Sequence, residues 1–288
     1  MKRILLASDF SDASEHAFRY ALNILGYVPC DCTLLHAFPI QLETAHTPFY
    51  EADIVQQRSL EMLSTLGRQL KAERNYRWHR FAPQTYPGNS LSAIQHASGQ
   101  EKYDWIIVGA SGRGLNPWLG STSSNLLREA RTNLMVVPAT AIIRPLQHIV
   151  IATDYESITS PDVFEPIRLL AANNQAHLTL LCVLKPGEKV APPSPEAQFR
   201  LRAFFGEVSL VTEFVENESA AEGIETFLND NPTADLLVTV PRHRSWADAI
   251  LGRSVTRQIV HHITIPLIAL YDPTLTATET RQQAVEVA

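Results

Sequence analysis

The chain has 288 residues, of which 45% are hydrophobic and 19% are charged, a composition typical of a folded globular protein. Its formal net charge of −6 argues against a general nucleic-acid-binding role, because a phosphate backbone would be repelled. No uninterrupted apolar run approaches the length of a membrane span, so we expect no membrane partner. The 3 cysteines, an odd and sparse number, indicate a reducing compartment, and we expect a cytoplasmic protein.

Apolar runs alternate with amphipathic segments along the first half of the chain. Buried strands are predicted over residues 3–8, 32–38, 76–84, 105–108 and 134–137. Helices are predicted over residues 13–25, 51–74, 91–98 and 123–131. Strands that alternate with helices specify a parallel sheet covered on both faces. Ligands bind such sheets outside the carboxyl ends of the strands, which is where Asp9 and Gly109 fall.

The long helix and the strand that follows it carry side chains of mixed character. We expect Met62 to face inward with the leucines of the helix, and Trp78 to lie in the core or in an interface. A basic run crosses both elements and is interpreted as a solvent-exposed face balanced by nearby acidic residues; it consists of Arg68, Lys71, Arg74, Arg77 and Arg80.

The pattern of the first half restarts after a short linker. The segment Ile4-Leu5-Leu6-Ala7-Ser8-Asp9-Phe10 is echoed by Ile149-Val150-Ile151-Ala152-Thr153-Asp154-Tyr155, and three further landmarks recur in the same order. Such an ordered recurrence indicates an internal duplication. We predict two domains, residues 1–138 and 146–272, followed by a polar tail, residues 273–288. Each copy ends in an apolar strand, so we expect residues 134–137 and 266–270 to meet edge to edge in an intramolecular pseudo-dimer, with a homodimer left open.

A glycine-rich stretch, V-G-A-S-G-R-G-L-N-P-W-L-G-S-T, joins a predicted strand to a predicted helix. Glycine lets a ligand approach the main chain, and Ser121 and Thr122 fall where free N–H groups of a helix start point outward. The spacing G-x2-G-x7-G-S-T and the carboxylate of Asp9 therefore favour a phosphate site. The stretch has neither the G-K-[ST] of a Walker A loop nor the G-x-G-x-x-G of a dinucleotide fold. The alternative is a tight strand-to-helix turn without a ligand.

These residues resemble the universal stress protein family. The resemblance covers nearly the whole chain as two tandem copies, and it rests on I-L-L-A-S-D-F-S, L-L-H-A-F, D-W-I-I-V-G-A-S-G and L-G-S-T-S-S-N-L-L. It implies an α/β fold of two Rossmann-like, adenine nucleotide alpha hydrolase-like domains. Each would hold a five-stranded parallel sheet with helices on both faces. It also implies ATP, with Mg²⁺, bound through a G-x2-G-x9-G-[ST] loop and an acidic residue after the first strand.

The site residues that the resemblance implies divide into three groups. The adenine would lie against Ala7, Ser8 and Ala37. The ribose would run beside Val108 and Gly109 and be hydrogen-bonded by Asp9. The phosphates would be cradled by Gly112, Gly120, Ser121 and Thr122. The loop differs from the family motif, because seven residues separate Gly112 from Gly120 where the motif has nine.

The second copy departs further from the motif. Val240 and His243 stand where the first two glycines are expected, and branched or bulky side chains resist a positive φ. We therefore expect ATP in the N-terminal domain only, in a stress-response or signalling protein. ATP hydrolysis would be slow at most, because no general base is evident. The alternative is a tandem scaffold or interaction protein that binds no nucleotide. An enzyme of the related fold, such as a nucleotidyl transferase or ATP pyrophosphatase, ranks last because its motifs are absent.

Overall fold

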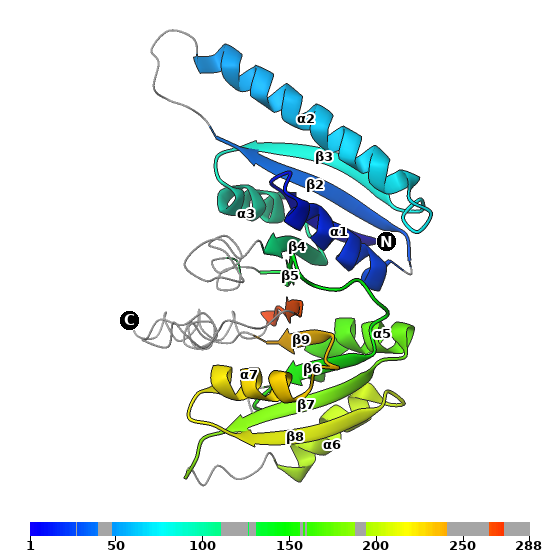
Figure 1. Ribbon diagram of the computed structural model, residues 1–288, viewed down its shortest axis with the longest axis vertical. Helices are drawn as coiled ribbons and strands as arrows, with labels where there is room; N and C mark the ends of the chain where they lie inside the picture. The colour runs from blue at the N-terminus through cyan, green and yellow to red at the C-terminus, as the bar shows by residue number, and fades with distance from the viewer. Residues whose placement is uncertain are drawn as a thin grey trace. The chain divides into compact units, whose positions relative to one another are not determined.

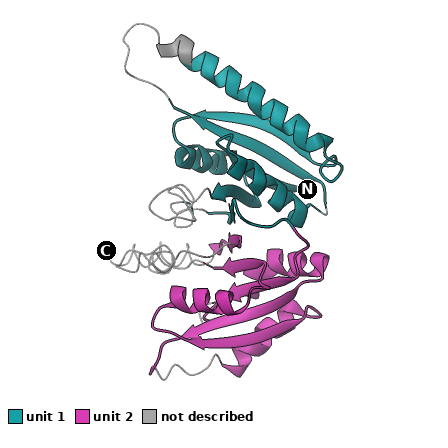
Figure 2. Ribbon diagram, in the orientation of Figure 1, with its two compact units in different colours: residues 1–143 teal, residues 144–288 magenta. Residues whose placement is uncertain are grey.

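The computed structural model of the chain describes residues 1–26, 28–39, 48–110, 126, 131–155, 158, 160–187, 194–240 and 265–273. The chain divides into two compact units, residues 1–143 and 144–288, which Figure 2 colours separately. Each unit has the α/β architecture that alternating strands and helices predict, and the strands described within each unit pair in parallel. A helix was predicted over residues 123–131. Of these residues the structure describes only Leu126 and Arg131, so this prediction lies outside the described residues.

Unit 1 holds a sheet with the strand order β3-β2-β1-β4-β5 (Figure 1). Its strands are β1 (Lys2–Ser8), β2 (Cys30–Phe38), β3 (Arg80–Pro87), β4 (Trp105–Ala110) and β5 (Asn133–Pro138). Its described helices are α1 (Asp12–Leu25), α2 (Pro48–Ala72) and α3 (Ser90–Gln100). Central strands such as Ile4-Leu5-Leu6 are completely buried, as expected for a parallel sheet covered on both faces.

The helices of unit 1 cover opposite faces of its sheet. A Cβ added at Gly67 of α2 would lie 3.1 Å from Phe81 Cβ, so α2 packs on the face to which Phe81 points. The ring of Tyr86 lies 4.7 Å from that of His96 in α3. Because successive side chains of a strand alternate between faces, Phe81 and Tyr86 point to opposite sides. Helix α3 therefore covers the face opposite to α2, as right-handed crossovers require for this strand order.

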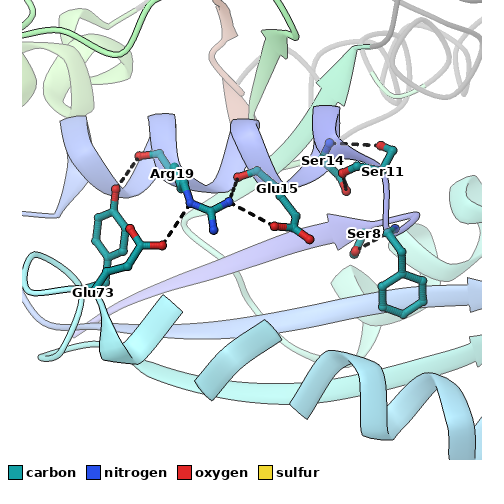
Figure 3. Close-up of polar contacts among 8 residues, drawn as sticks. Ser8, Ser11, Ser14, Glu15, Arg19 and Glu73 are labelled. Carbon is teal, nitrogen blue, oxygen red and sulfur yellow. Dashed lines mark hydrogen bonds and ion pairs between the residues drawn. The ribbon is translucent and has the colours of Figure 1, made fainter. Parts of the chain in front are cut away.

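The third strand of unit 1 begins later than predicted. Strand β3 starts at Arg80, whereas a strand was predicted over residues 76–84. Tyr76 and His79 are buried in the preceding turn, where the Tyr76 hydroxyl donates to Arg19 O at 3.2 Å and Cys30 N–H donates to His79 Nδ1 at 3.2 Å. The same turn is tied to α1 by Glu73, which pairs with Arg19 (Figure 3). The apolar and polar residues of this turn alternate as they would in a strand, because Tyr76 and His79 are buried. The predicted start of the strand at residue 76 was therefore wrong.

The prediction for one side chain, Met62, was also wrong, and of the two alternatives for Trp78 the structure excludes the core. Met62 is 43% exposed on α2, although it was placed inward with the leucines. Trp78 is 63% exposed and lies outside the core, with the guanidinium of Arg77 4.3 Å from the centre of its ring. Leu63, by contrast, is fully buried as expected.

Unit 2 repeats the strand order of unit 1, as β10-β9-β6-β7-β8. Its strands are β6 (His148–Ala152), β7 (His177–Leu184), β8 (Leu210–Glu216), β9 (Leu236–Thr239) and β10 (Leu267–Ala269). Its described helices are the 3₁₀ helix η1 (Pro161–Phe164) and the α-helices α5 (Glu165–Asn174), α6 (Pro195–Phe205) and α7 (Ala220–Asp230). The repetition extends the duplication from sequence to topology.

An aspartate at the start of the fourth strand of each copy ties that strand to the first. Asp104 Oδ2 accepts the N–H of Arg3 at 2.8 Å in unit 1. Asp235 Oδ2 accepts the N–H of His148 at 3.0 Å in unit 2. These residues occupy matching positions of the two copies, so the same hydrogen bond sets the start of both sheets. In unit 2 the aspartate is also paired with Arg144.

Candidate functional site

The carboxyl ends of β1, β2 and β4 meet at one edge of the unit 1 sheet. In the register of the sheet, Ala7 pairs with Leu35 on one side and with Val108 on the other. Asp9 follows β1 directly, and Gly109 follows Val108 in β4. The structure thus brings six of the predicted site residues to this edge: Ala7, Ser8, Asp9, Ala37, Val108 and Gly109. The other four, Gly112, Gly120, Ser121 and Thr122, lie outside the described residues.

Asp9 is held by the residue that caps α1. Its Oδ1 accepts hydrogen bonds from the N–H of Ser11, at 3.0 Å, and from the Ser11 hydroxyl. Ser11 Oγ in turn accepts the N–H of Ser14 at 3.2 Å, which caps the helix (Figure 3). Partial burial raises the pKa of Asp9, but the hydrogen bonds from Ser11 outweigh it, so the pKa lies below its ordinary value. The Asp9 side chain is therefore an ionised acceptor at neutral pH.

The turn after β1 is built around Phe10. Its φ of 59° is in the left-handed region, which is uncommon for an aromatic residue. Its N–H donates to Ser8 Oγ at 3.1 Å, so the buried Ser8 hydroxyl is engaged within the turn. Its ring lies 4.3 Å from that of His36. These contacts fix the backbone that carries Asp9.

His36 is a residue of this edge that sequence reasoning missed. Its Nδ1 lies 2.8 Å from Ser8 O, and because a carbonyl only accepts, this nitrogen carries the proton. In a neutral ring the Nε2 atom is then the acceptor. The available signal was a histidine near the end of the otherwise apolar strand C-T-L-L-H-A-F. That pattern does not distinguish a site residue from one that only supports the backbone.

Gly109 has a packing requirement of its own. A Cβ at this position would lie 2.5 Å from Ala13 O and 2.9 Å from Ser14 N, in the first turn of α1. Real Cβ atoms do not come this close to backbone atoms, so a larger residue would displace the helix. Close approach of α1 to β4 explains this glycine without a ligand.

Unit 2 keeps the turn but changes its surroundings. Tyr155 has a φ of 61°, and its N–H donates to Thr153 Oγ1 at 3.1 Å, as Phe10 does to Ser8 in unit 1. Its ring is buried, and its hydroxyl donates to Thr212 Oγ1 at 3.1 Å. Burial raises the pKa of Tyr155 to about 12, against the opposite effect of the hydrogen bond to Thr212. The phenol is therefore neutral and part of the core.

The position of Gly109 is taken in unit 2 by Val240, which is buried. In unit 1 the side chain of a valine would collide with the start of α1, which begins at Asp12, soon after Asp9. In unit 2 the first helix after Asp154 among the described residues is η1, which begins only at Pro161. A later helix start is a physical reason why a valine is accommodated there. His243 lies outside the described residues.

The cysteines were also considered as possible reactive or metal-binding residues. Cys30, Cys32 and Cys182 are buried free thiols. Burial raises the pKa of Cys30 to about 11 and raises that of Cys32 as well, so both stay protonated. Among the described residues no group of three His, Cys, Asp or Glu could hold a metal ion. Nor is any helix in the same ranges long and apolar enough to cross a membrane.

Comparison with known proteins identifies the family of this chain. The model of the universal stress protein family matches residues 1–138 and again residues 145–270. A universal stress protein structure from Archaeoglobus fulgidus DSM 4304 superposes on this chain with a TM-score of 0.68 at 16% sequence identity. The superposition covers 93% of this chain and 95% of the Archaeoglobus chain. A functionally unknown protein from Pseudomonas aeruginosa PAO1 superposes with a TM-score of 0.62 at 16% identity, over 96% and 95% of the two chains. No curated protein sequence matches the chain. The chain belongs to the universal stress protein family, in its tandem two-domain form.

Proposed function

We propose that the chain is an ATP-binding stress-response or signalling protein, with the nucleotide at the carboxyl edge of β1, β2 and β4 in unit 1. The observation that carries this proposal is the carboxylate of Asp9. It is ionised at neutral pH, stands directly after β1, and is exposed beside the capped start of α1. Ligands of open parallel sheets bind at this edge.

Asp9 has the chemistry to hold a ribose. An ionised carboxylate is an acceptor only, and it can receive hydrogen bonds from the two hydroxyls of a ribose. Hydrogen bonds to charged groups are stronger than those between neutral groups. Ser11 already donates to Oδ1 of Asp9, which keeps the side chain in one orientation before a ligand arrives.

The adenine end would be formed by small side chains. Ala7 and Ala37 are half-buried at the ends of β1 and β2, where they offer an apolar wall with little bulk. Val108 and Gly109 continue this wall along β4. At the phosphate end, we propose that Gly112, Gly120, Ser121 and Thr122 supply N–H and hydroxyl donors, with Mg²⁺ accompanying the ATP. Hydrolysis would be slow at most.

We propose that unit 2 binds no nucleotide. Val240 stands at the position that Gly109 holds in unit 1, and the first described helix after Asp154 begins only at Pro161. We keep the domain bounds inferred from the sequence, residues 1–138 and 146–272 with a tail at 273–288. The buried free thiols are compatible with a reducing compartment, and we propose the cytoplasm.

A second function, a tandem scaffold without nucleotide, is favoured by one specific observation. The notable features of the edge already have partners within the chain. Ser11 engages Asp9, Phe10 engages Ser8, and α1 accounts for Gly109. A turn that is satisfied internally needs no ligand to explain it.

Calorimetric titration of the intact chain with ATP and adenosine separates the two functions. Asp9→Ala should weaken both ligands by about 1–3 kcal/mol, because a charged hydrogen-bond acceptor of the ribose is lost. Asp154→Ala is the matched control in unit 2 and should leave both affinities unchanged. Gly120→Val should weaken ATP far more than adenosine, because a branched side chain blocks approach of the phosphates.

The scaffold takes the place of the nucleotide function if the parent chain shows no affinity for ATP at millimolar concentration. Equal losses in Asp9→Ala and Asp154→Ala would contradict binding in unit 1 alone. Melting temperatures of all variants without ligand serve as the folding control.

A further inference from the structure

An open groove of about 860 Å³ lies between α2 and β3 in unit 1. Strand β3 is the outermost strand of the unit 1 sheet in the direction away from β1, and α2 runs alongside it (Figure 1). The groove is separate from the nucleotide edge proposed above, because its lining comes from the body of α2 and from the first half of β3. It is part of the surface that the basic run of the sequence crosses.

The rim of the groove is positively charged. Arg68, Lys71 and Arg80 line it, and Glu61 is the one acidic residue of the lining. This local excess of positive charge contrasts with the net charge of −6 of the whole chain. The other two members of the basic run, Arg74 and Arg77, are exposed but do not line the groove.

The cations of the rim are only weakly engaged within the described part of the chain. Arg80 Nη1 lies 3.9 Å from Asp31 Oδ1, and the Arg80 side chain is 79% exposed. Arg68 Nη2 donates to a neutral acceptor, Thr65 Oγ1, at 3.1 Å. These exposed positive charges remain available to carboxylates of a partner.

The floor of the groove is apolar. Leu60 contributes from α2, and Phe81 and Pro83 contribute from β3, while Leu63 lies fully buried beneath them. Gly67 of α2 also lines the groove, and it lies close to Phe81 because it carries no side chain of its own. An apolar floor with a charged rim is the usual composition of a surface that recognises another protein.

The backbone hydrogen bonds of β3 limit how a partner segment could bind in the groove. Gly88 N–H donates to Phe38 O at 2.8 Å. The backbone N–H and C=O groups of the even-numbered residues of β3 therefore point toward β2, and those of the odd-numbered residues point away from the sheet. Pro83 and Pro87 are at outward positions and have no N–H to donate. Regular addition of another strand to this edge is therefore disfavoured. An occupant would be held by side chains.

We propose that this groove binds an extended acidic segment of a partner protein. Carboxylates of the segment would pair with Arg68, Lys71 and Arg80, and its apolar side chains would rest on Leu60 and Phe81. Glu61 on the rim and the net negative charge of the chain favour a segment with spaced carboxylates over a continuous polyanion such as nucleic acid. Charge complementarity of this kind determines the choice of partner.

Fluorescence anisotropy with a labelled peptide that alternates glutamate and leucine tests the proposal on the intact chain. The triple variant Arg68→Glu, Lys71→Glu, Arg80→Glu should lose about tenfold or more in affinity. The matched control reverses three exposed charges outside the groove, Arg74→Glu, Arg77→Glu and Lys102→Glu, and should retain the parent affinity. Peptides that alternate glutamine with leucine, or glutamate with serine, should both bind more weakly than the glutamate–leucine peptide.

Several outcomes would overturn the proposal. One is the absence of saturable peptide binding to the parent at low ionic strength. Another is an equal loss in both triple variants, which would reduce the effect to general charge. A third is displacement of the peptide by oligothymidylate or by phosphatidylserine vesicles at lower concentrations than by unlabelled peptide, which would assign the groove to nucleic acid or to a membrane surface. Thermal melting of both triple variants verifies that they fold.

Discussion

Replacing Gly109 by alanine tests whether this glycine serves the fold or only a ligand. The added Cβ would lie 2.5 Å from Ala13 O, 2.7 Å from Ala13 C and 2.9 Å from Ser14 N, well inside the 3.4 Å at which ordinary van der Waals contact begins. All three atoms belong to the backbone of the first turn of α1, so no side-chain rotation relieves the overlap. The helix start or the end of β4 must shift.

The expected cost follows from the kind of overlap. Forcing an additional carbon into a well-packed region destabilises a protein by about 1–3 kcal/mol. Gly99→Ala is the matched control, because a Cβ there meets nothing within 4 Å and the residue lies near the end of α3. Alanine in a helix is more stable than glycine by about 0.5–1 kcal/mol. The same substitution should therefore change stability in opposite directions at the two positions.

Chemical denaturation of the chain without nucleotide, followed by circular dichroism, measures both changes. Because no ligand is present, a loss of stability in Gly109→Ala can only come from the fold. If Gly109→Ala stays within about 0.5 kcal/mol of the parent, the packing argument is refuted, because surface changes of no consequence fall in that range. A matching loss in Gly99→Ala would equally show that the effect does not come from the contact with α1.

Three further predictions concern other parts of the chain. Tyr155→Phe removes the hydrogen bond to Thr212 and should destabilise unit 2 by about 1 kcal/mol; an unchanged denaturation midpoint would contradict the buried bond. Burial lowers the pKa of His79 from its ordinary value of 6.5, so its contribution to stability is present above pH 6.5 and is lost as the pH falls from there toward the folded-state pKa. Chemical denaturation from pH 7 to pH 5, a range that brackets the ordinary histidine pKa of about 6.5, should show this loss of stability in the parent and a smaller loss in His79→Leu. If the free energy of unfolding falls with pH equally steeply in both proteins, His79 is excluded as the cause. The terminal strands at residues 134–137 and 266–270 should meet edge to edge, and a crystal structure with these strands apart would refute the intramolecular pseudo-dimer.

The strand and helix pattern could be predicted from the sequence because it depends on local periodicity. Buried runs such as Trp105-Ile106-Ile107-Val108 are apolar without alternation, and α1 repeats its apolar residues with helical spacing. The boundary at β3 could not be predicted in the same way. The burial of Tyr76 and His79 depends on the distant residues Arg19 and Cys30, and a window of neighbouring residues contains neither.

The candidate site was predictable only in part. The sequence placed Asp9 at the end of a strand, and the register of β1 with β2 and β4 agrees with that placement. It contained no sign that Ser11 would hold the carboxylate or that His36 would lie against Phe10. A hydrogen bond depends on backbone angles at the turn, and φ at Phe10 is one that its residue type does not favour.

The sequence by itself determined the duplication and the parallel α/β class, because both are recorded as order and period along the chain. It also placed a glycine after Val108, but the reason for that glycine is tertiary. Ala13 and Gly109 are distant in sequence, and they come together only when β4 pairs with β1 and α1 packs across them. In unit 2 the first described helix begins later, at Pro161, and a buried valine, Val240, stands at the same position. Whether a position needs glycine is decided by which backbone lies beside it, and only the folded structure contains that information.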